Sequence, residues 1–524
     1  MLVRHFRWVA ASLIVACLAL FGTIASATTA DHSKFKELQQ DFASGTSVTK
    51  ACLQCHGKAA DQVMHTTHWT WEYVNPVTKQ VLGKKHLINN FCIAIETNEA
   101  HCATCHVGYG YKDRNFDFTN KEAVDCLVCH DTTGAYRKQP GMAGEVVTRE
   151  MEFPPGSGRI VKPVDLRKVA QKVGPTSRDT CGTCHFRGGG GDGVKHGDMD
   201  SSLAAPDEDL DIHMNAIGLD FKCSTCHMTK EHRVPGSRYA PTARDDKGRI
   251  VRGNTDGRNP TTCESCHDNA PHRMSRLNTH ATKLACQTCH VPKFARGGIP
   301  TKMSWDWSTA GRLDPQGEQF EIKDDKGHKI YESREGSMIL GENVVPEYRW
   351  FNGIVEYTLM GQKIDPTRVV QINRFLGSPD DGKSLIWPVK VMRGKQPYDV
   401  ENLTLVKPET ARLDDTAYWK NLDWEKAIEF SMRSAGQPFS GKVGFVSTEM
   451  YWPITHMVAP KDKGLGCADC HSAESRLAGL AGIYMPGYSA NRLLDRLGWG
   501  LVALTALGVV GHGLMRFVAA RKRK

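Results

Sequence analysis

Eight copies of one short pattern, Cys-x-x-Cys-His, constrain what this 524-residue chain can fold into. The two thiols of each copy stand three positions apart, so they can bond to the two vinyl groups of one haem, and the histidine that follows can bind the iron. The pattern predicts eight covalently attached c-type haems, and we number the copies motifs 1 to 8 in chain order. Their cysteines are Cys52 and Cys55, Cys102 and Cys105, Cys126 and Cys129, Cys181 and Cys184, Cys223 and Cys226, Cys263 and Cys266, Cys286 and Cys289, and Cys467 and Cys470. Their histidines are His56, His106, His130, His185, His227, His267, His290 and His471.

Two other uses of cysteine fit this pattern less well. Paired Cys-x-x-Cys units bind structural zinc, and many cysteines in a secreted chain suggest disulfide bonds. Neither use requires a histidine directly after the second cysteine, yet all eight copies have one. Haem attachment is therefore favoured over zinc. Only Cys17 and Cys92 lie outside the motifs.

The formal net charge of +9 does not indicate a nucleic-acid-binding protein. Part of the excess lies at the ends of the chain, in Arg4, Arg7 and residues 521–524. Eight haems would also bring about sixteen propionate carboxylates, which offset the positive charge. We therefore expect no nucleic-acid partner. Hydrophobic residues make up 40% of the chain, below the usual share, which fits a core partly built from porphyrin rings.

Both ends of the chain carry membrane-targeting features. Residues 1–27 combine two arginines, an apolar run and Ala-Ser-Ala, which predicts a cleaved signal peptide; an uncleaved anchor is the alternative. Residues 496–520 are apolar enough for a transmembrane helix, and the basic tail 521–524 should stay in the cytoplasm. We therefore expect an inner-membrane anchor with the haem domain in the periplasm.

The spacing of the motifs predicts how the chain is divided. Motifs 1 to 7 lie within 28–291, a seven-haem domain, and motif 8 lies within a segment covering 461–495. Between them, residues 292–460 contain no cysteine and should form a haem-free insert that wraps the haem core. We expect a mainly α protein with little regular sheet and a small β-containing insert. Within the insert, Asn352-Gly353 favours a β-hairpin, and the pattern of residues 414–433 favours a helix.

A second axial ligand decides what each haem does. A strong ligand gives an electron carrier, whereas a weak or displaceable one leaves a site for substrate. His65 and His86 remain open as eighth ligands, while His32 and His328 lie in polar stretches, His101 directly precedes a motif, and His512 falls in the membrane span. The best candidates for this second ligand are His68, His196, His213, His232, His272, His280 and His456.

The chain resembles the octahaem tetrathionate reductases, which are related to octahaem hydroxylamine oxidoreductases and nitrite reductases. The resemblance covers about Cys52 to His471 and rests on four segments: Cys-Leu-Gln-Cys-His-Gly-Lys at 52–58, His-Trp-Thr-Trp at 68–71, Asn-Asn-Phe-Cys at 89–92, and Cys-His-Phe-Arg-Gly-Gly-Gly-Gly-Asp-Gly-Val-Lys-His-Gly-Asp at 184–198. In that family the haem of motif 2 is the substrate site and has a lysine ligand. The resemblance implies Lys195 as that ligand, with Asn89, Cys92 and Asp192 lining the pocket.

The residues around Lys195 are compatible with that role. The glycines of 188–191 let backbone approach a haem closely, and a desolvated lysine can offer a neutral amine. The alternative is a surface lysine paired with Asp192, and Lys138 and Lys168 are further candidates. Cys92 can exchange with the sulfur–sulfur bond of tetrathionate if its thiolate is accessible; otherwise it is a small buried apolar residue.

These observations predict a respiratory reductase that acts on an inorganic sulfur or nitrogen oxyanion. Electrons would come from a quinol-linked donor, with a b-type cytochrome among the candidates. His512 within the span can ligate a b-type haem or form a hydrogen bond across a helix pair. One alternative is a non-catalytic electron conduit between the quinol pool and periplasmic partners. Another is hydroxylamine oxidation, which needs a tyrosine linked to the catalytic haem; Tyr109 and Tyr111 follow motif 2. The membrane span departs from the family pattern, and no oligomeric state is predicted.

Overall fold

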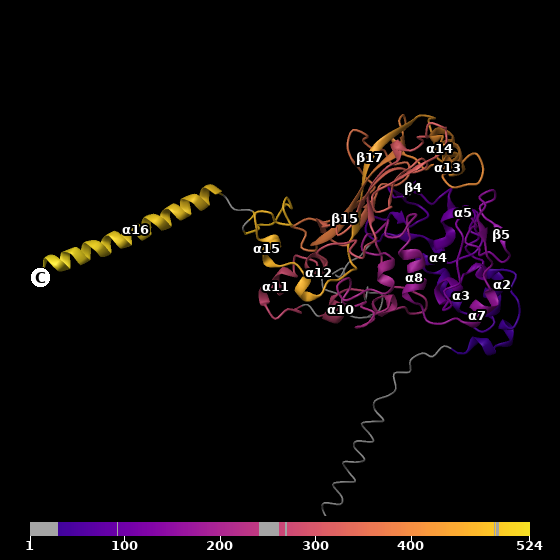
Figure 1. Cartoon of the computed structure of the whole chain (residues 1–524), viewed down its shortest axis with the longest axis horizontal. Helices are drawn as coiled ribbons and strands as arrows, with labels where there is room; N and C mark the ends of the chain where they lie inside the picture. The colour runs from indigo at the N-terminus through magenta and orange to yellow at the C-terminus, as the bar shows by residue number, and fades with distance from the viewer. Residues whose placement is uncertain are drawn as a thin grey trace, which may run out of the picture.

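A computed structural model of the chain describes residues 30–91, 93–239, 261–267, 270–486, 488 and 492–523. The predicted signal peptide, Cys17 and Cys92 lie outside these residues. Figure 1 shows short helices at the N-terminal end of the body, a long-stranded sheet, and a C-terminal helix that extends away from both.

The N-terminal part consists mainly of short helices separated by turns. Helix α2 begins after Ser44, whose hydroxyl accepts a hydrogen bond from the Ser47 amide and so satisfies a free N–H group of the first turn. The helices are α2 (Gly45–Leu53), α3 (Ala59–Met64), α4 (Thr67–Thr70), α5 (Glu99–Cys102), α6 (Leu127–His130), α7 (Leu166–Gln171), α8 (Arg178–His185), α9 (Cys223–Cys226), α10 (Glu264–His267), α11 (Ser275–His280) and α12 (Cys286–His290). Short two-residue strands lie between them: β1 (Tyr73–Val74), β2 (Val81–Leu82), β3 (Ile88–Asn89), β4 (Ile93–Ala94), β5 (Met151–Glu152) and β6 (Ile160–Val161).

Most motifs form a single helical turn. In motif 1, for example, the His56 amide donates to the Cys52 carbonyl at 2.9 Å, which brings both cysteines and the histidine to one side of the turn. Motif 2 differs, because residues Ala103–Cys105 form a tighter 3₁₀ turn and the His106 amide donates to Ala103 at 3.0 Å. The second motif therefore presents its histidine with a different backbone geometry.

The insert contains more sheet than its sequence suggests. Nine strands form one mixed sheet in the order β13-β17-β15-β7-β10-β9-β8, with β11 and β16 also paired to β15. Much of β15 is buried along consecutive residues, so it lacks the alternation that would mark it as a strand. The strands of the insert are β7 (Thr301–Asp306), β8 (Glu321–Lys323), β9 (Lys329–Glu332), β10 (Gly336–Gly341), β11 (Glu347–Phe351), β12 (Val355–Tyr357), β13 (Val370–Gln371), β14 (Asn373–Phe375), β15 (Leu385–Asp399), β16 (Thr404–Leu405) and β17 (Val443–Pro453).

The predicted hairpin at Asn352-Gly353 is wrong. Strands β11 and β12 flank this pair but do not pair with each other, because β11 joins β15 and β12 joins β14. The Asn352 amide donates to the Leu376 carbonyl, and Gly353 adopts a φ of 95°. The turn therefore carries the chain from one sheet to another. The predicted helix at 414–433 forms as α13 (Tyr418–Asn421) and α14 (Trp424–Ser434), separated by Leu422 at a φ of 56°.

The insert packs against the region of motif 2. Its largest apolar core combines Trp305, Met392 and Trp452 of the sheet with Ile88 and Phe91 of the N-terminal part. Polar contacts add to this interface. Asn98 accepts hydrogen bonds from the amide and hydroxyl of Thr410, and the Thr97 hydroxyl meets that of Ser431.

The chain ends in one long apolar helix. After α15 (Cys467–Cys470), residues 475–485 pack on the sheet, where the Trp350 indole donates to the Ala481 carbonyl at 2.8 Å. Helix α16 (Arg492–Lys522) follows, and its apolar window has a mean hydropathy of 1.7 with no part buried. Its 31 residues span about 46 Å, more than the ~30 Å of bilayer hydrocarbon. The helix is long and apolar enough to cross a membrane.

Candidate active site

Seven motif histidines each face a second histidine. Two imidazoles that bind one iron from opposite sides, with metal–nitrogen bonds of about 2.0 Å, have ring centres about 6 Å apart. The observed ring separations fit that arrangement, so these residues are suited to hold seven haems. The pairs are His32 with His56 (6.3 Å), His68 with His185 (6.2 Å), His232 with His130 (6.4 Å), His213 with His267 (5.9 Å), His456 with His227 (6.5 Å), His272 with His290 (6.0 Å) and His280 with His471 (6.1 Å).

His196 is the one predicted distal histidine that the structure places elsewhere. Its ring packs on Trp452 at 4.9 Å and, among the described ring contacts, faces no motif histidine. His32 is instead the seventh histidine that faces a motif histidine, His56. Its polar surroundings suggested an exposed residue, and its position before motif 1 is the signal that could have identified it.

The two histidines left open have other partners. His65 is hydrogen-bonded through Nδ1 to the Asp61 carbonyl at 2.6 Å, and His86 through Nε2 to the Glu72 carboxylate at 2.8 Å. His101 packs against Trp419. The described residues thus give motif 2 no histidine partner from this set.

Cysteines of different motifs lie next to each other and reveal the order of the haem sites. Side-chain contacts link Cys52 with Cys126, Cys105 with Cys184, Cys181 with Cys223, and Cys263 with Cys286. Electrostatic proximity links Cys129 with Cys181, Cys226 with Cys266, and Cys289 with Cys470. The motifs therefore form a line in the order 1-3-4-5-6-7-8, and motif 2 branches from motif 4.

His106 of motif 2 lies in an aromatic enclosure. Its ring centre is 4.9 Å from both Trp71 and Tyr111 and 5.2 Å from Trp69. Its Nε2 is hydrogen-bonded to the Trp69 carbonyl at 2.6 Å, while Nδ1 is buried and has no partner among the described residues. Burial lowers the pKa of His106 to about 3, which keeps the ring neutral. Its Nε2 would have to leave the Trp69 carbonyl to bind a metal.

Lys195 approaches motif 2 from the glycine-rich loop. Burial, followed by the positive charges of Arg238 and Lys84, holds the pKa of Lys195 well below its usual value, and Cys105 opposes that shift. The amine is therefore close enough to interact with a cysteine of motif 2, and it favours the neutral form that can donate a lone pair to a metal.

One glycine of the loop and two side chains of the sheet position Lys195. Gly189 has a φ of 82°, and a Cβ there would lie 2.5 Å from Phe91, so both backbone and space require glycine. From the sheet, Lys390 donates through Nζ to the carbonyls of Val194 (2.8 Å) and Lys195 (3.1 Å). The Thr301 hydroxyl donates to the Gly193 carbonyl at 2.6 Å. Sequence reasoning missed Lys390 and Thr301, because no local pattern links the distant insert to this loop.

The other predicted pocket residues are placed as follows. Asn89 is buried in β3, and its Oδ1 accepts from the Phe91 amide at 3.2 Å. The Asp192 carboxylate accepts from the Ser201 amide at 2.9 Å and, in the described contacts, does not pair with Lys195. Cys92 lies outside the described residues. Of the further lysine candidates, Lys138 forms a buried ion pair with Asp125, and Lys168 is exposed.

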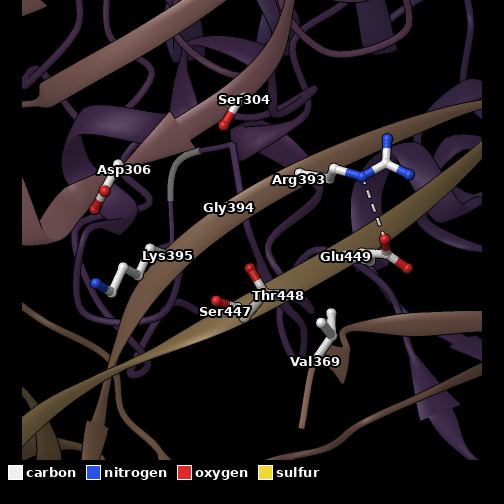
Figure 2. A pocket seen from close by; sticks show the side chains of 9 residues that line it. All are labelled: Ser304, Asp306, Val369, Arg393, Gly394, Lys395, Ser447, Thr448 and Glu449. Atoms are coloured by element: carbon white, nitrogen blue, oxygen red, sulfur yellow. Dashed lines mark ion pairs between the residues drawn. The ribbon is translucent and has the colours of Figure 1, made fainter.

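A polar cavity of about 340 Å³ lies elsewhere, between strands β7, β15 and β17 (Figure 2). Arg393 crosses to Glu449 at 3.3 Å in this cavity. Its lining contains no cysteine or histidine, so it is not a haem-binding site. The lining residues are Ser304, Asp306, Val369, Arg393, Gly394, Lys395, Ser447, Thr448 and Glu449.

Comparisons with known proteins agree with the eight sites. The family described as "Cytochrome c bacterial" matches residues 302–474, which join the sheet to motif 8. The crystal structure of octaheme cytochrome c from Shewanella oneidensis is 40% identical, with a TM-score of 0.75, and the match covers 87% of this chain and 98% of that one. An uncharacterized protein of Archaeoglobus fulgidus is 25% identical over 298 residues, which are 46% of this chain and 96% of that protein.

Proposed function

The chain belongs to the octahaem c-type cytochromes, and on that premise we propose that it is a membrane-anchored respiratory reductase whose working site is the haem of motif 2. It binds eight haems covalently and functions in electron transfer. The observation that carries the proposal is the difference between motif 2 and the other seven. His106 alone among the motif histidines faces no second histidine in the described residues, and Lys195 approaches its motif instead.

The proposed reaction is the two-electron reduction of tetrathionate to two thiosulfates, with nitrite and hydroxylamine as alternative substrates. When bound, the haems supply one-electron carriers in series. His106 and Lys195 are the residues that would hold the haem of the working site, and a weakly bound Lys195 amine would leave room for substrate. Burial favours the neutral form of this amine, and the aromatic enclosure around His106 excludes water from its ring.

The membrane helix supports a quinol-linked electron donor, and a b-type cytochrome is the partner we propose. Motif 8 lies 21 residues before helix α16 in sequence. In Figure 1, α11, α12 and α15 lie at the end of the body from which α16 extends. Electrons from a membrane donor would reach motifs 7 and 8 first. We place the helix in the inner membrane and the haem domain in the periplasm, because c-type motifs are typical of extracytoplasmic domains.

The line of paired histidines supports a second candidate function, an electron conduit. It runs from motif 8 to motif 1, where Cys55 and His56 are exposed and can meet a soluble partner. A conduit needs no free coordination position at motif 2. Hydroxylamine oxidation needs a tyrosine linked to the haem. The Tyr109 hydroxyl is engaged with Asp125 at 2.8 Å and with Tyr136 at 2.7 Å, which leaves Tyr111, whose ring packs on His106, as the candidate.

Low-temperature EPR and electrode voltammetry on the purified holoprotein test the reductase proposal. We expect one haem signal unlike the other seven, and catalytic current with tetrathionate, nitrite or hydroxylamine. Lys195→Ala should abolish that current and change the unusual signal while eight haems remain bound. Lys168→Ala, an exposed lysine on α7, is the matched control. Eight equivalent signals and no current with any substrate would favour the conduit.

A further inference from the structure

Trp452 of β17 lies at the centre of a group of basic side chains. Lys195 Nζ lies 5.4 Å from the centre of its ring, Arg238 Cζ lies 4.8 Å away, and the His196 ring lies 4.9 Å away. Phe91 closes the group at 5.6 Å. We call these five residues the Trp452 cluster.

Two hydrogen-bond donors in the Trp452 cluster are buried and unused. Arg238 donates through Nη2 to the Tyr239 hydroxyl at 3.0 Å, but its Nη1 has no partner among the described residues. The indole Nε1 of Trp452 is likewise buried without a partner in the described part of the chain. A buried donor left unpaired destabilises a fold, and an unpaired guanidinium more so. A group that accepts from these donors is therefore expected beside them.

The positive charge around these two donors indicates that the group that accepts from them is an anion. The positive charges of Lys84 and Arg238 both lower the pKa of Lys195, and that of Arg238 also lowers the pKa of His196. Within the described residues, no carboxylate forms an ion pair with Lys195 or Arg238, and the electrostatic partners of Arg238 include only tyrosines as acidic groups. The guanidinium of Arg238, with the Lys84 amine nearby and no acid beside it, attracts an anion. A guanidinium favours oxygens in pairs, as in carboxylates and oxyanions.

We propose that Arg238 and Trp452 form a binding site for an anionic oxygen group beside motif 2. Two sources share this chemistry, a propionate of a neighbouring haem and the diffusible oxyanion substrate; the second rests on the proposed function. In either case the group accepts hydrogen bonds from Arg238 Nη1 and Trp452 Nε1. The site is distinct in role from Lys195, which approaches Cys105 of motif 2, whereas Arg238 holds positive charge beside Lys195.

Three variants of the holoprotein test this site. Arg238→Gln removes the charge, and Trp452→Phe keeps the aromatic packing but removes the N–H donor. Arg433→Gln, an exposed arginine on α14, is the matched control. Haem content is measured first, followed by calorimetric titration with tetrathionate and with nitrite, and by spectroscopic redox titration of the haems.

The two sources give different results. If the anion is diffusible, both site variants raise the Kd of tetrathionate or nitrite about tenfold or more, and the haem potentials stay unchanged. If the anion is a propionate, Kd stays unchanged, and Arg238→Gln lowers the midpoint potential of at least one haem, because a lost positive charge favours the oxidised form. Either result, or both together, supports the site.

The proposal is overturned if both site variants retain eight haems and match the control in Kd and in every potential. If Arg238→Gln does not bind eight haems, Arg238→Lys replaces it, because lysine keeps the charge but lacks the paired donors. The same measurements are then made on Arg238→Lys and Trp452→Phe. A wild-type protein without turnover would end the reductase proposal but would leave the redox titration able to decide on this site.

Discussion

Lys138 shows how a buried charge supports motif 2 from its proximal side. Its amine lies 2.7 Å from Asp125, with the two side chains 2% and 0% exposed, and it donates to the carbonyls of His106 (2.7 Å) and Gly108 (3.1 Å). Asp125 in turn accepts from the Val128 amide of motif 3 and from Tyr109. One ion pair thus joins the backbones of two haem-binding motifs.

Removing one partner of this pair should destabilise the protein strongly. Lys138→Met leaves Asp125 charged in the interior, which typically costs about 3–5 kcal/mol. Thermal unfolding followed by circular dichroism should show a large fall in Tm, and the double variant with Asp125→Asn should recover part of it. Lys121→Met, which breaks an exposed pair with Asp61, is the control and should cost less than about 1 kcal/mol. Equal effects of the two single variants would contradict the structural role of the buried pair.

Glu409 should make stability depend on pH. Burial raises its pKa from 4.5 to about 8, although the amides of Ala411 and Arg412 oppose the shift. A carboxyl with a raised folded-state pKa contributes stability that is full below pH about 4.5 and is lost as pH rises through about 8. Glu409→Gln should remove this dependence, so that the variant gains on the order of a few kcal/mol relative to wild type at pH 8 but not at pH 4.5.

Tm measured between pH 4.5 and 9 checks the effect of Glu409. The wild-type curve should fall toward alkaline pH more steeply than that of Glu409→Gln. Glu401→Gln, which alters an exposed pair with Lys442, serves as the control and should run parallel to wild type. Parallel curves for all three proteins would show that Glu409 does not hold its proton in the folded state.

At the scale of elements, the sheet supports the loop that carries Lys195. Strand β15 supplies Lys390 and β7 supplies Thr301, and together they bind the carbonyls of residues 193–195. A sheet built from distant parts of the chain therefore fixes a short glycine-rich loop, whose residues have little conformational preference of their own.

Lys390→Met should loosen this loop. The variant keeps the apolar stem of the side chain but loses hydrogen bonds to Val194, Lys195 and Thr301. We expect the unusual EPR signal to broaden or split, and catalytic current to fall at least tenfold, while eight haems remain bound. Lys395→Met lies on the same strand but faces the polar cavity, and it should leave the signal unchanged. An unaltered signal in both variants would show that the loop holds Lys195 without the sheet.

At the scale of the whole molecule, helix α16 should act as an anchor separable from the haem domain. Residues 475–485 pack on the sheet, so a chain that ends after Pro486 keeps every described haem ligand and every strand. We expect this shortened protein to carry eight haems and to leave the membrane fraction without detergent, whereas the full chain requires detergent. Retention of the shortened protein in washed membranes would show a second membrane contact.

The sequence was most informative where chemistry is local. The eight motifs could be identified from spacing alone, because attachment of one haem needs three residues within one turn. The second histidine at each haem site is brought there by tertiary contacts, which spacing in the sequence does not reveal. Six of the seven proposed histidines face a motif histidine. His196 packs on Trp452 instead, and His32, which was not among the seven, faces His56. The extent of the sheet was missed for a similar reason: β15 is buried along much of its length and lacks the alternation that marks a half-exposed strand.

The position of motif 4 has a consequence for control of the whole array. Motif 2 contacts the line of motifs only through Cys184 among the described cysteine contacts. Within the contacts of the described cysteines, motif 4 is thus the junction that joins the proposed working site to the other motifs. Electrons that follow these contacts from either end pass motif 4 before motif 2. The potential of the haem that His185 and His68 are placed to hold would therefore control transfer to motif 2 from both ends. Motifs 1 and 3, beyond the junction, can then store charge between turnovers.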